Sequence, residues 1–170
     1  MPREPKVDPS CYVAAEAIII GDVEIAKDCS IWPFAVLRAD LSPIRIGQGS
    51  SVQEHCQIHG NPGKPTVIGS NVSIGHGAIV HAARIGDYVI IGMNSCILDG
   101  AEVGSGSVVG ASAVVTENMK IPEGSLVVGV PAKILRQGDP SLKEAARRNA
   151  EAYHRLRDSH KNGEYRRFTR

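Results

Sequence analysis

The stretch from Ile85 to Val127 reads IGDYVIIGMNSCILDGAEVGSGSVVGASAVVTENMKIPEGSLV, and a large aliphatic residue returns at every sixth position. The series is Ile85, Ile91, Ile97, Val103, Val109, Val115, Ile121 and Val127. Glycine often follows the aliphatic residue, and the residue four places after the aliphatic one is usually small. An α-helix repeats near 3.6 residues and a strand near 2, so a period of six fits neither element by itself. It predicts a short strand followed by a corner.

The same pattern extends toward the N-terminus, from Val13 to Val80, with two interruptions. The interval between Leu37 and Ile46 carries three extra residues, and the interval between Ile58 and Ile68 carries four. Three strands joined by corners close a triangular coil of about 18 residues, and successive coils stack at about 4.8 Å. The sequence therefore predicts a solenoid whose core is the column of aliphatic side chains.

These repeats resemble the hexapeptide-repeat family of left-handed parallel β-helices over roughly residues 13–130. The resemblance implies the left-handed sense, which a six-residue period alone does not determine. We therefore expect an all-β solenoid, a left-handed parallel β-helix with a C-terminal α-helix. Its expected organisation is a β-helix domain over 1–137, a C-terminal α-helix packing on it over 138–162, and a tail over 163–170.

The segment after the repeats has the start and stop signals of a helix. Asp139 can accept a hydrogen bond as the N-cap, Pro140 suits the first helical position, and Gly163 marks the end. Residues that share one helical face follow a spacing of three to four: Leu142, Ala145, Ala146, Asn149, Tyr153 and Leu156. This face should pack on the β-helix or on a neighbouring chain.

The composition argues against several classes of function. Lys and Arg number 19 against 18 Asp and Glu, a formal charge of +1, so no strong field favours nucleic acid or an anionic membrane. No apolar run approaches the ~20 residues of a membrane span, and the N-terminus has no apolar signal region. The four cysteines form no CxxC pair, which argues against a thiolate zinc site. We expect a single-domain cytoplasmic protein.

The repeat predicts where three histidines lie on the solenoid. Once the inserted residues are discounted, Arg38, His59 and His81 lie one turn apart in a single outward column. His76 lies two places after Ile74, near a corner of another face, where it cannot easily reach the other two histidines of its own chain. If three prisms pack around a three-fold axis, the corner of one meets the face of the next. In such a homotrimer, His76 would complete a three-histidine site between subunits.

Three neutral imidazoles with an open fourth position are the ligand set of a catalytic zinc that activates water. At this point the chain closely resembles the gamma-class carbonic anhydrases, through Arg38-Ala39-Asp40, Gln53-Glu54, His59 and the segment GHGAIVH at 75–81. The resemblance implies one divalent metal per subunit, held by His59, His81 and a neighbouring subunit's His76. It further implies reversible hydration of carbon dioxide to bicarbonate.

The resemblance also implies roles for the surrounding side chains. Arg38 and Asp40 look like the pair that forms salt bridges across the interface and supports the site. Gln53 resembles the residue that hydrogen-bonds the hydroxide. The acidic proton-shuttle loop of the founding enzymes is missing here, because the loop after His59 contains NPGKPT. Glu54 and Tyr153 are the candidate substitutes, and low turnover would follow from slow proton export.

Two other functions fit the same repeats. Acyl-CoA-dependent acyltransferases also use hexapeptide coils, a trimer and a segment like GVPAK at 129–133, with one histidine as general base. That chemistry does not explain three histidines in register with Gln53 and Arg38. A metal-binding scaffold protein with little catalysis is the second alternative. Zinc is the expected metal, and iron or cobalt would also suit imidazole ligands.

Overall fold

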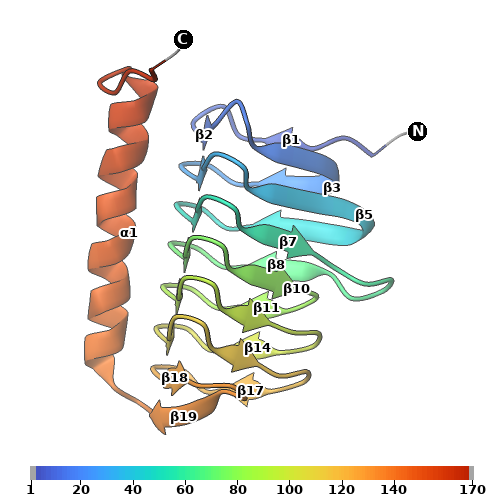
Figure 1. Ribbon diagram of the computed structural model, residues 1–170, viewed down its shortest axis with the longest axis vertical. Helices are drawn as coiled ribbons and strands as arrows, with labels where there is room; N and C mark the ends of the chain where they lie inside the picture. The colour runs from blue at the N-terminus through green and yellow to red at the C-terminus, as the bar shows by residue number, and fades with distance from the viewer. Residues whose placement is uncertain (1–2, 169–170) are drawn as a thin grey trace.

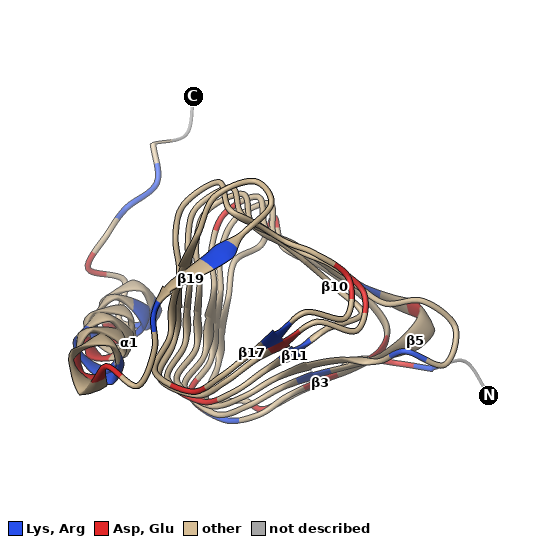
Figure 2. Cartoon of the chain, turned by 90° about the horizontal axis from the view of Figure 1, so that it is seen from below, with Lys and Arg blue, Asp and Glu red and all other residues tan. Residues whose placement is uncertain are grey.

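The computed structural model describes residues 3–168, so the outermost two positions of the expected 1–137 domain and of the 163–170 tail lie outside the described residues. The chain coils into a parallel β-solenoid, a left-handed β-helix of triangular cross-section, and one long helix runs back along its side (Figures 1 and 2). This confirms the solenoid that the six-residue period predicts and the left-handed β-helix that the resemblance implies. No helix in the described part is both long and apolar enough to cross a bilayer.

One side of the prism, the helix face, is a single sheet covered by the helix. Its strands are β2 (Tyr12–Val13), β4 (Ser30–Ile31), β6 (Ser51–Val52), β9 (Ser73–Ile74), β12 (Ile90–Ile91), β15 (Val108–Val109) and β18 (Leu126–Val128). At its base β18 pairs with the antiparallel β19 (Lys133–Arg136), which closes the stack and leads the chain to the helix.

The second side, the histidine face, has one strand from each successive coil. It consists of the first part of β3 (Ile18–Ile25), the first part of β5 (Val36–Ile46), then β7 (Gln57–His59), β10 (Ile79–His81), β13 (Cys96–Ile97) and β16 (Val114–Val115). No helix or strand covers this face within residues 3–168 (Figure 2).

The third side, the charged face, has a mostly charged outward column that contains Lys6, Glu24, Arg45, Val67, Arg84, Glu102 and Lys120. Its strands are β1 (Lys6–Val7), the second parts of β3 and β5, then β8 (Thr66–Ile68), β11 (Arg84–Ile85), β14 (Glu102–Val103) and β17 (Lys120–Ile121). Because β3 and β5 bend around a corner, they belong to both the histidine face and the charged face, which form one continuous sheet. The three extra residues after Leu37 lie within this bend.

The inward aliphatic column forms the core. Ile31, Val52, Ile74, Ile91 and Val109 are fully buried on the helix face, each paired with its neighbour in the next coil. Burying each such side chain contributes roughly 1.5–3 kcal/mol relative to exposure. Since every coil supplies one residue to each column, the coils cannot slip by one residue without turning the core outward.

The helix α1 (Pro140–Lys161) has the ends that the sequence predicts. Asp139 accepts a hydrogen bond from the backbone N–H of Ser141, and Pro140 lies in the first turn. Leu142, Ala146 and Ala150 are buried against the helix face, where α1 contacts β2, β4 and β9. The helix thereby places Tyr153 beside the strand that precedes His76.

Candidate functional site

The backbone pairing places Arg38, His59 and His81 in one column, as the repeat arithmetic predicts. Arg38 pairs with His59 between β5 and β7, and His59 pairs with His81 between β7 and β10. All three side chains leave the histidine face outward. In a parallel sheet, in-register residues stack at the strand spacing, so the two imidazoles come within contact distance.

The two imidazoles meet through one nitrogen each. His59 Nδ1 lies 3.1 Å from His81 Nε2. The other nitrogen of each ring faces a carboxylate: His59 Nε2 lies 3.0 Å from Asp40 Oδ1, and His81 Nδ1 lies 2.6 Å from Asp99 Oδ1. We call the two histidines the His59/His81 pair, and Asp40 and Asp99 its carboxylates.

Both carboxylates are ionised at neutral pH. Hydrogen bonds from Arg38 and then from His59 lower the pKa of Asp40 to about 2. Burial raises the pKa of Asp99, but hydrogen bonds from His81 and Asn61 outweigh it and lower the pKa overall. An ionised carboxylate accepts, so each ring nitrogen facing one donates its N–H.

It follows that in neutral imidazoles the two facing nitrogens both carry lone pairs. Two lone pairs 3.1 Å apart repel unless a proton or a cation lies between them. Two nitrogens bound to one tetrahedral zinc at 2.0–2.1 Å lie about 3.4 Å apart, close to the separation found here. A carboxylate behind a ligating imidazole is also the usual supporting arrangement in metal sites. The donor set therefore fits a divalent metal.

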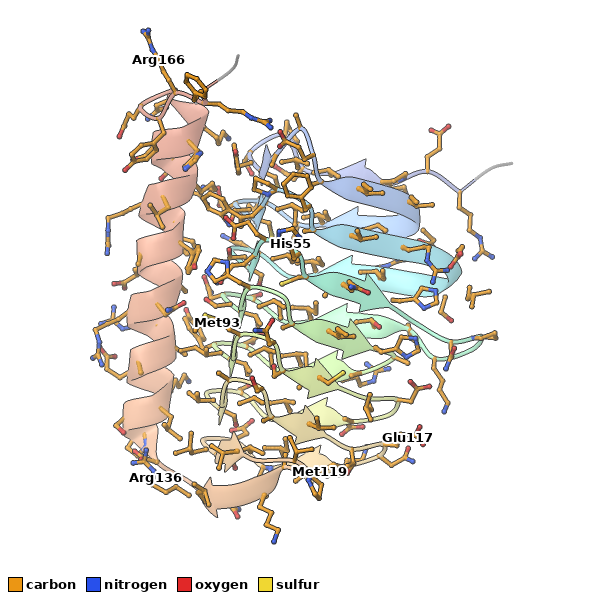
Figure 3. The ribbon with its side chains drawn as sticks, in the orientation of Figure 1. His55, Met93, Glu117, Met119, Arg136 and Arg166 are labelled. Atoms are coloured by element: carbon orange, nitrogen blue, oxygen red, sulfur yellow. The ribbon has the colours of Figure 1, made fainter. Side chains whose placement is uncertain are left out.

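The remaining predicted ligand lies at another place on the chain. His76 Nδ1 lies 2.6 Å from Glu54 Oε2, and the backbone N–H of His76 donates to Gln53 Oε1 at 3.2 Å. These residues occupy the corner between the helix face and the histidine face, where Figure 3 labels His55 and Met93. Among residues 3–168, no group of three or more His, Cys, Asp or Glu side chains could hold a metal within one chain.

Tyr153 joins the second group from the helix. It lines a groove of about 390 Å³ between α1 and the helix face, together with Gln53, His76, Met93 and Asn149. Burial, followed by the charge of Glu54, raises the pKa of Tyr153. Its hydroxyl therefore stays protonated at neutral pH and serves as a hydrogen-bond donor.

The structure thus brings the eight predicted site residues into two groups. Arg38, Asp40, His59 and His81 meet on the histidine face, while the corner and helix carry Gln53, Glu54, His76 and Tyr153. Arg38 forms its ion pair with Asp40 of its own chain, at 2.6 Å. This ion pair lies within one chain, whereas the resemblance implies salt bridges between subunits.

Asp99 is the site residue that the sequence reasoning missed. It accepts from His81 and also from Asn61 Nδ2 at 2.6 Å, so it connects the histidine to the inserted loop of residues 60–65. The sequence did contain a signal for Asp99, because an acidic residue lies about one turn of the solenoid after His81. The repeat from Val80 to Ile85 is one residue short, however, so the register pairs Val80 with Ile97 and leaves Asp99 one place beyond His81's partner.

The other three histidines have structural partners. His55 stacks on Phe34 with ring centroids 5.2 Å apart. His154 Nε2 lies 2.9 Å from the carbonyl oxygen of Gly49, and His160 packs on Tyr12 and Trp32. These contacts give the three histidines structural roles away from the His59/His81 pair.

Comparison with known proteins decides the family. The model of the Bacterial transferase hexapeptide (six repeats) family matches residues 82–117. A protein from Methanocaldococcus jannaschii named "Probable carbonic anhydrase" is 45% identical over 153 residues, covering 90% of this chain and 96% of the relative. "Gamma carbonic anhydrase 1, mitochondrial" from Arabidopsis thaliana is 37% identical over 79% of this chain. The chain belongs to the gamma-class carbonic anhydrase family.

Members and neighbours of this family carry other names too. The chain spans 51% of the plant relative's length. The carnitine operon protein CaiE of Escherichia coli is 36% identical over 89% of this chain and 78% of its own length. A crystal structure of a putative acetyltransferase from Bacillus cereus superposes with a TM-score of 0.91 at 36% identity, covering 94% of this chain and 93% of that one. Membership therefore supports a carbonic-anhydrase-like role and a divalent metal, and leaves the reaction to be argued from the site.

Proposed function

We propose that the chain is one subunit of a homotrimeric, metal-dependent carbonic anhydrase that hydrates carbon dioxide reversibly to bicarbonate. His59 and His81 of one subunit and His76 of the next would hold one divalent metal, with zinc the first choice and iron or cobalt also compatible. The observation that carries this proposal is that each of the three imidazoles has one nitrogen against a carboxylate and the other left for a metal.

The character of the uncovered face supports the trimer. Beside the column of Arg38, His59 and His81, the histidine face has a second outward column that is largely apolar and contains Ile18, Val36, Gln57, Ile79, Cys96 and Val114. Ile18 is 49% exposed, whereas the outward column of the charged face is mostly charged. At the corner carrying His76, Phe34 and Met93 are each 52% exposed. Packing that corner against the histidine face of another copy would bury both apolar surfaces and bring His76 to the His59/His81 pair.

Each residue has a task that its contacts suit. A bound divalent metal supplies hydroxide at neutral pH by acidifying water. Asp40, Asp99 and Glu54 hold the imidazoles in the tautomer that points the free nitrogen at the metal. Gln53 uses its Oε1 to accept from His76, so its Nε2–H groups remain to orient a substrate oxygen.

The proton released by hydration would leave through the corner group. Glu54 is a carboxylate beside His76, and its side chain is 35% exposed, so it reaches both the site and solvent. The protonated Tyr153 hydroxyl can donate to a substrate or water oxygen but is a poor carrier of protons near neutral pH. We assign proton export to Glu54 and substrate positioning to Gln53 and Tyr153.

The first experiment measures carbon dioxide hydration by protein loaded anaerobically with zinc, ferrous iron or cobalt, beside a chelator-stripped control. His76→Ala should lose both the metal and the activity. His55→Ala is the matched control, because His55 lies at the same corner but stacks on Phe34 instead of facing a carboxylate near the site. It should keep both.

Mixed trimers test the sharing of the site. His76→Ala and His81→Ala chains are each expected to be inactive alone. When equal amounts are unfolded, mixed and refolded together, about one quarter of the shared sites should regain a complete ligand set. Failure of the mixture to regain activity, with each variant trimeric, would contradict a site between subunits. Stoichiometric metal without hydration would favour the scaffold reading, and acyl-CoA substrates would then be tested.

A further inference from the structure

Two cysteines lie one above the other at the N-terminal end of the solenoid. Tyr12 pairs with Ser30 between β2 and β4, which puts the preceding residues, Cys11 and Cys29, in successive coils. Cys29 is fully buried in the core, and Cys11 is partly buried against it. Each thiol donates to a backbone carbonyl oxygen, Cys11 to that of Ala26 at 3.1 Å and Cys29 to that of Gly47 at 3.2 Å, and each thiol perturbs the pKa of the other.

Their spacing suits a disulfide. Residues in register on neighbouring strands have Cα atoms roughly 4.8 Å apart. A disulfide requires a Cα separation of about 4.4–6.8 Å. Strand β2 is the terminal strand of its sheet, so Cys11 can shift slightly without displacing a further coil.

The two thiols differ in reactivity. The neighbouring Cys29 side chain lowers the pKa of Cys11 to about 7, against burial and against the nearby carboxylates of Asp8 and Asp28. The pKa of Cys29 is raised, first by the same contact and then by burial. A partly exposed thiol with substantial thiolate at neutral pH, next to a buried second thiol, is the arrangement of a peroxide-reactive cysteine and its resolving partner.

We infer that Cys11 and Cys29 form a peroxide-sensitive dithiol whose oxidised form is a disulfide between the first two coils. The Cys11 thiolate attacks one oxygen of hydrogen peroxide, the O–O bond breaks, and the departing hydroxide takes a proton to become water. Cys11 sulfur, oxidised by two electrons, is then a sulfenic acid. The Cys29 sulfur attacks it, the S–S bond forms, and the S–O bond breaks. The leaving hydroxide takes the Cys29 proton as a second water.

The disulfide would anchor the end of the molecule that α1 also holds. Arg157 of α1 donates to the carbonyl oxygen of Asp28 at 2.6 Å, and Lys161 bonds the carbonyl oxygen of Ser10. The terminal coil has a neighbour on one side only, so it is the coil most prone to open. Closing the loop between Cys11 and Cys29 would oppose this opening.

The test treats the reduced, full-length protein with hydrogen peroxide under native conditions and maps its peptides by mass spectrometry. We expect a mass lower by about 2 Da, one cross-linked peptide pair containing Cys11 and Cys29, and reversal by dithiothreitol. The midpoint of thermal unfolding should rise by on the order of 5 to 10 °C in the oxidised form.

Variants distinguish this from general thiol oxidation. In Cys29→Ala, Cys11 should stop at a sulfenic acid that dimedone traps, formed more slowly than in wild type because the thiol that lowers the pKa of Cys11 is gone. Cys11→Ser should abolish the cross-link. Cys96→Ser is the matched control, since Cys96 is partly buried with its pKa raised by burial and pairs in register with Ile79 and Val114. Equal oxidation of Cys96 and Cys11 in the wild type, or over-oxidised Cys11 without a cross-link, would overturn the inference.

Discussion

Replacing Asp99 should weaken metal binding without touching a metal ligand. Asp99 accepts the Nδ1–H of His81 at 2.6 Å, and its side chain is 15% exposed, so water replaces this contact poorly. Loss of a carboxylate behind a ligating imidazole typically reduces metal affinity by about 10- to 100-fold. That range corresponds to about 1.4–2.7 kcal/mol of binding free energy. Asp99→Asn, which keeps an acceptor, should fall at the low end, and Asp99→Ala at the high end.

The assay is competition for zinc with a chromophoric chelator at fixed pH and ionic strength. Asn61→Ala removes the other hydrogen bond of Asp99. It should reduce zinc affinity less than Asp99→Ala does, because His81 keeps its carboxylate partner. Glu102→Gln is the control, a carboxylate on the charged face that pairs with Lys120. In the metal-free protein, nitrogen NMR should show His81 protonated at Nδ1, and this preference should weaken in Asp99→Ala. Zinc affinity within two-fold of wild type in both Asp99 variants would refute the reasoning.

Two further predictions concern the core. Ile74 is fully buried between Val52 and Ile91, so Ile74→Ala should lower the free energy of unfolding by about 2–5 kcal/mol in urea denaturation, and Ile74→Val by about 1 kcal/mol. Burial raises the pKa of Cys56 to about 12, so the folded state holds a proton that the unfolded thiol loses near pH 8.5. This contribution is complete below about pH 8.5 and falls toward pH 12, by up to about 1.4 kcal/mol per pH unit. Cys56→Ala should unfold with a weaker alkaline dependence than wild type, and parallel pH profiles would contradict the assignment.

The fold was predictable because one period governs most of the chain. Each six-residue unit carries its own strand and corner, so local sequence and global architecture repeat together. The register of Arg38, His59 and His81 followed from counting insertions, since parallel stacking converts sequence separation into position. The N-cap at Asp139 is equally local and was equally readable.

Other features depended on contacts that no count of repeats contains. The shortened repeat after Val80 shifts the register by one place, and only the folded chain shows that this brings Asp99 to His81. The repeat places His76 at a corner, but only the folded chain shows that its Nδ1 lies against Glu54. Side-chain rotamers and corner geometry depend on packing among residues that are far apart in the chain, so the repeat does not predict them.

By itself, then, the sequence determined the solenoid, its aliphatic core, the terminal helix and the column of outward histidines, because a strict period leaves one way to bury the aliphatic residues. Tertiary structure decided which nitrogen of each imidazole is held by a carboxylate, and that Asp99 is one of those carboxylates. Hydrogen bonds act over about 3 Å, whereas the period places a residue only to within a strand spacing. The chemistry of the site therefore belongs to the folded chain.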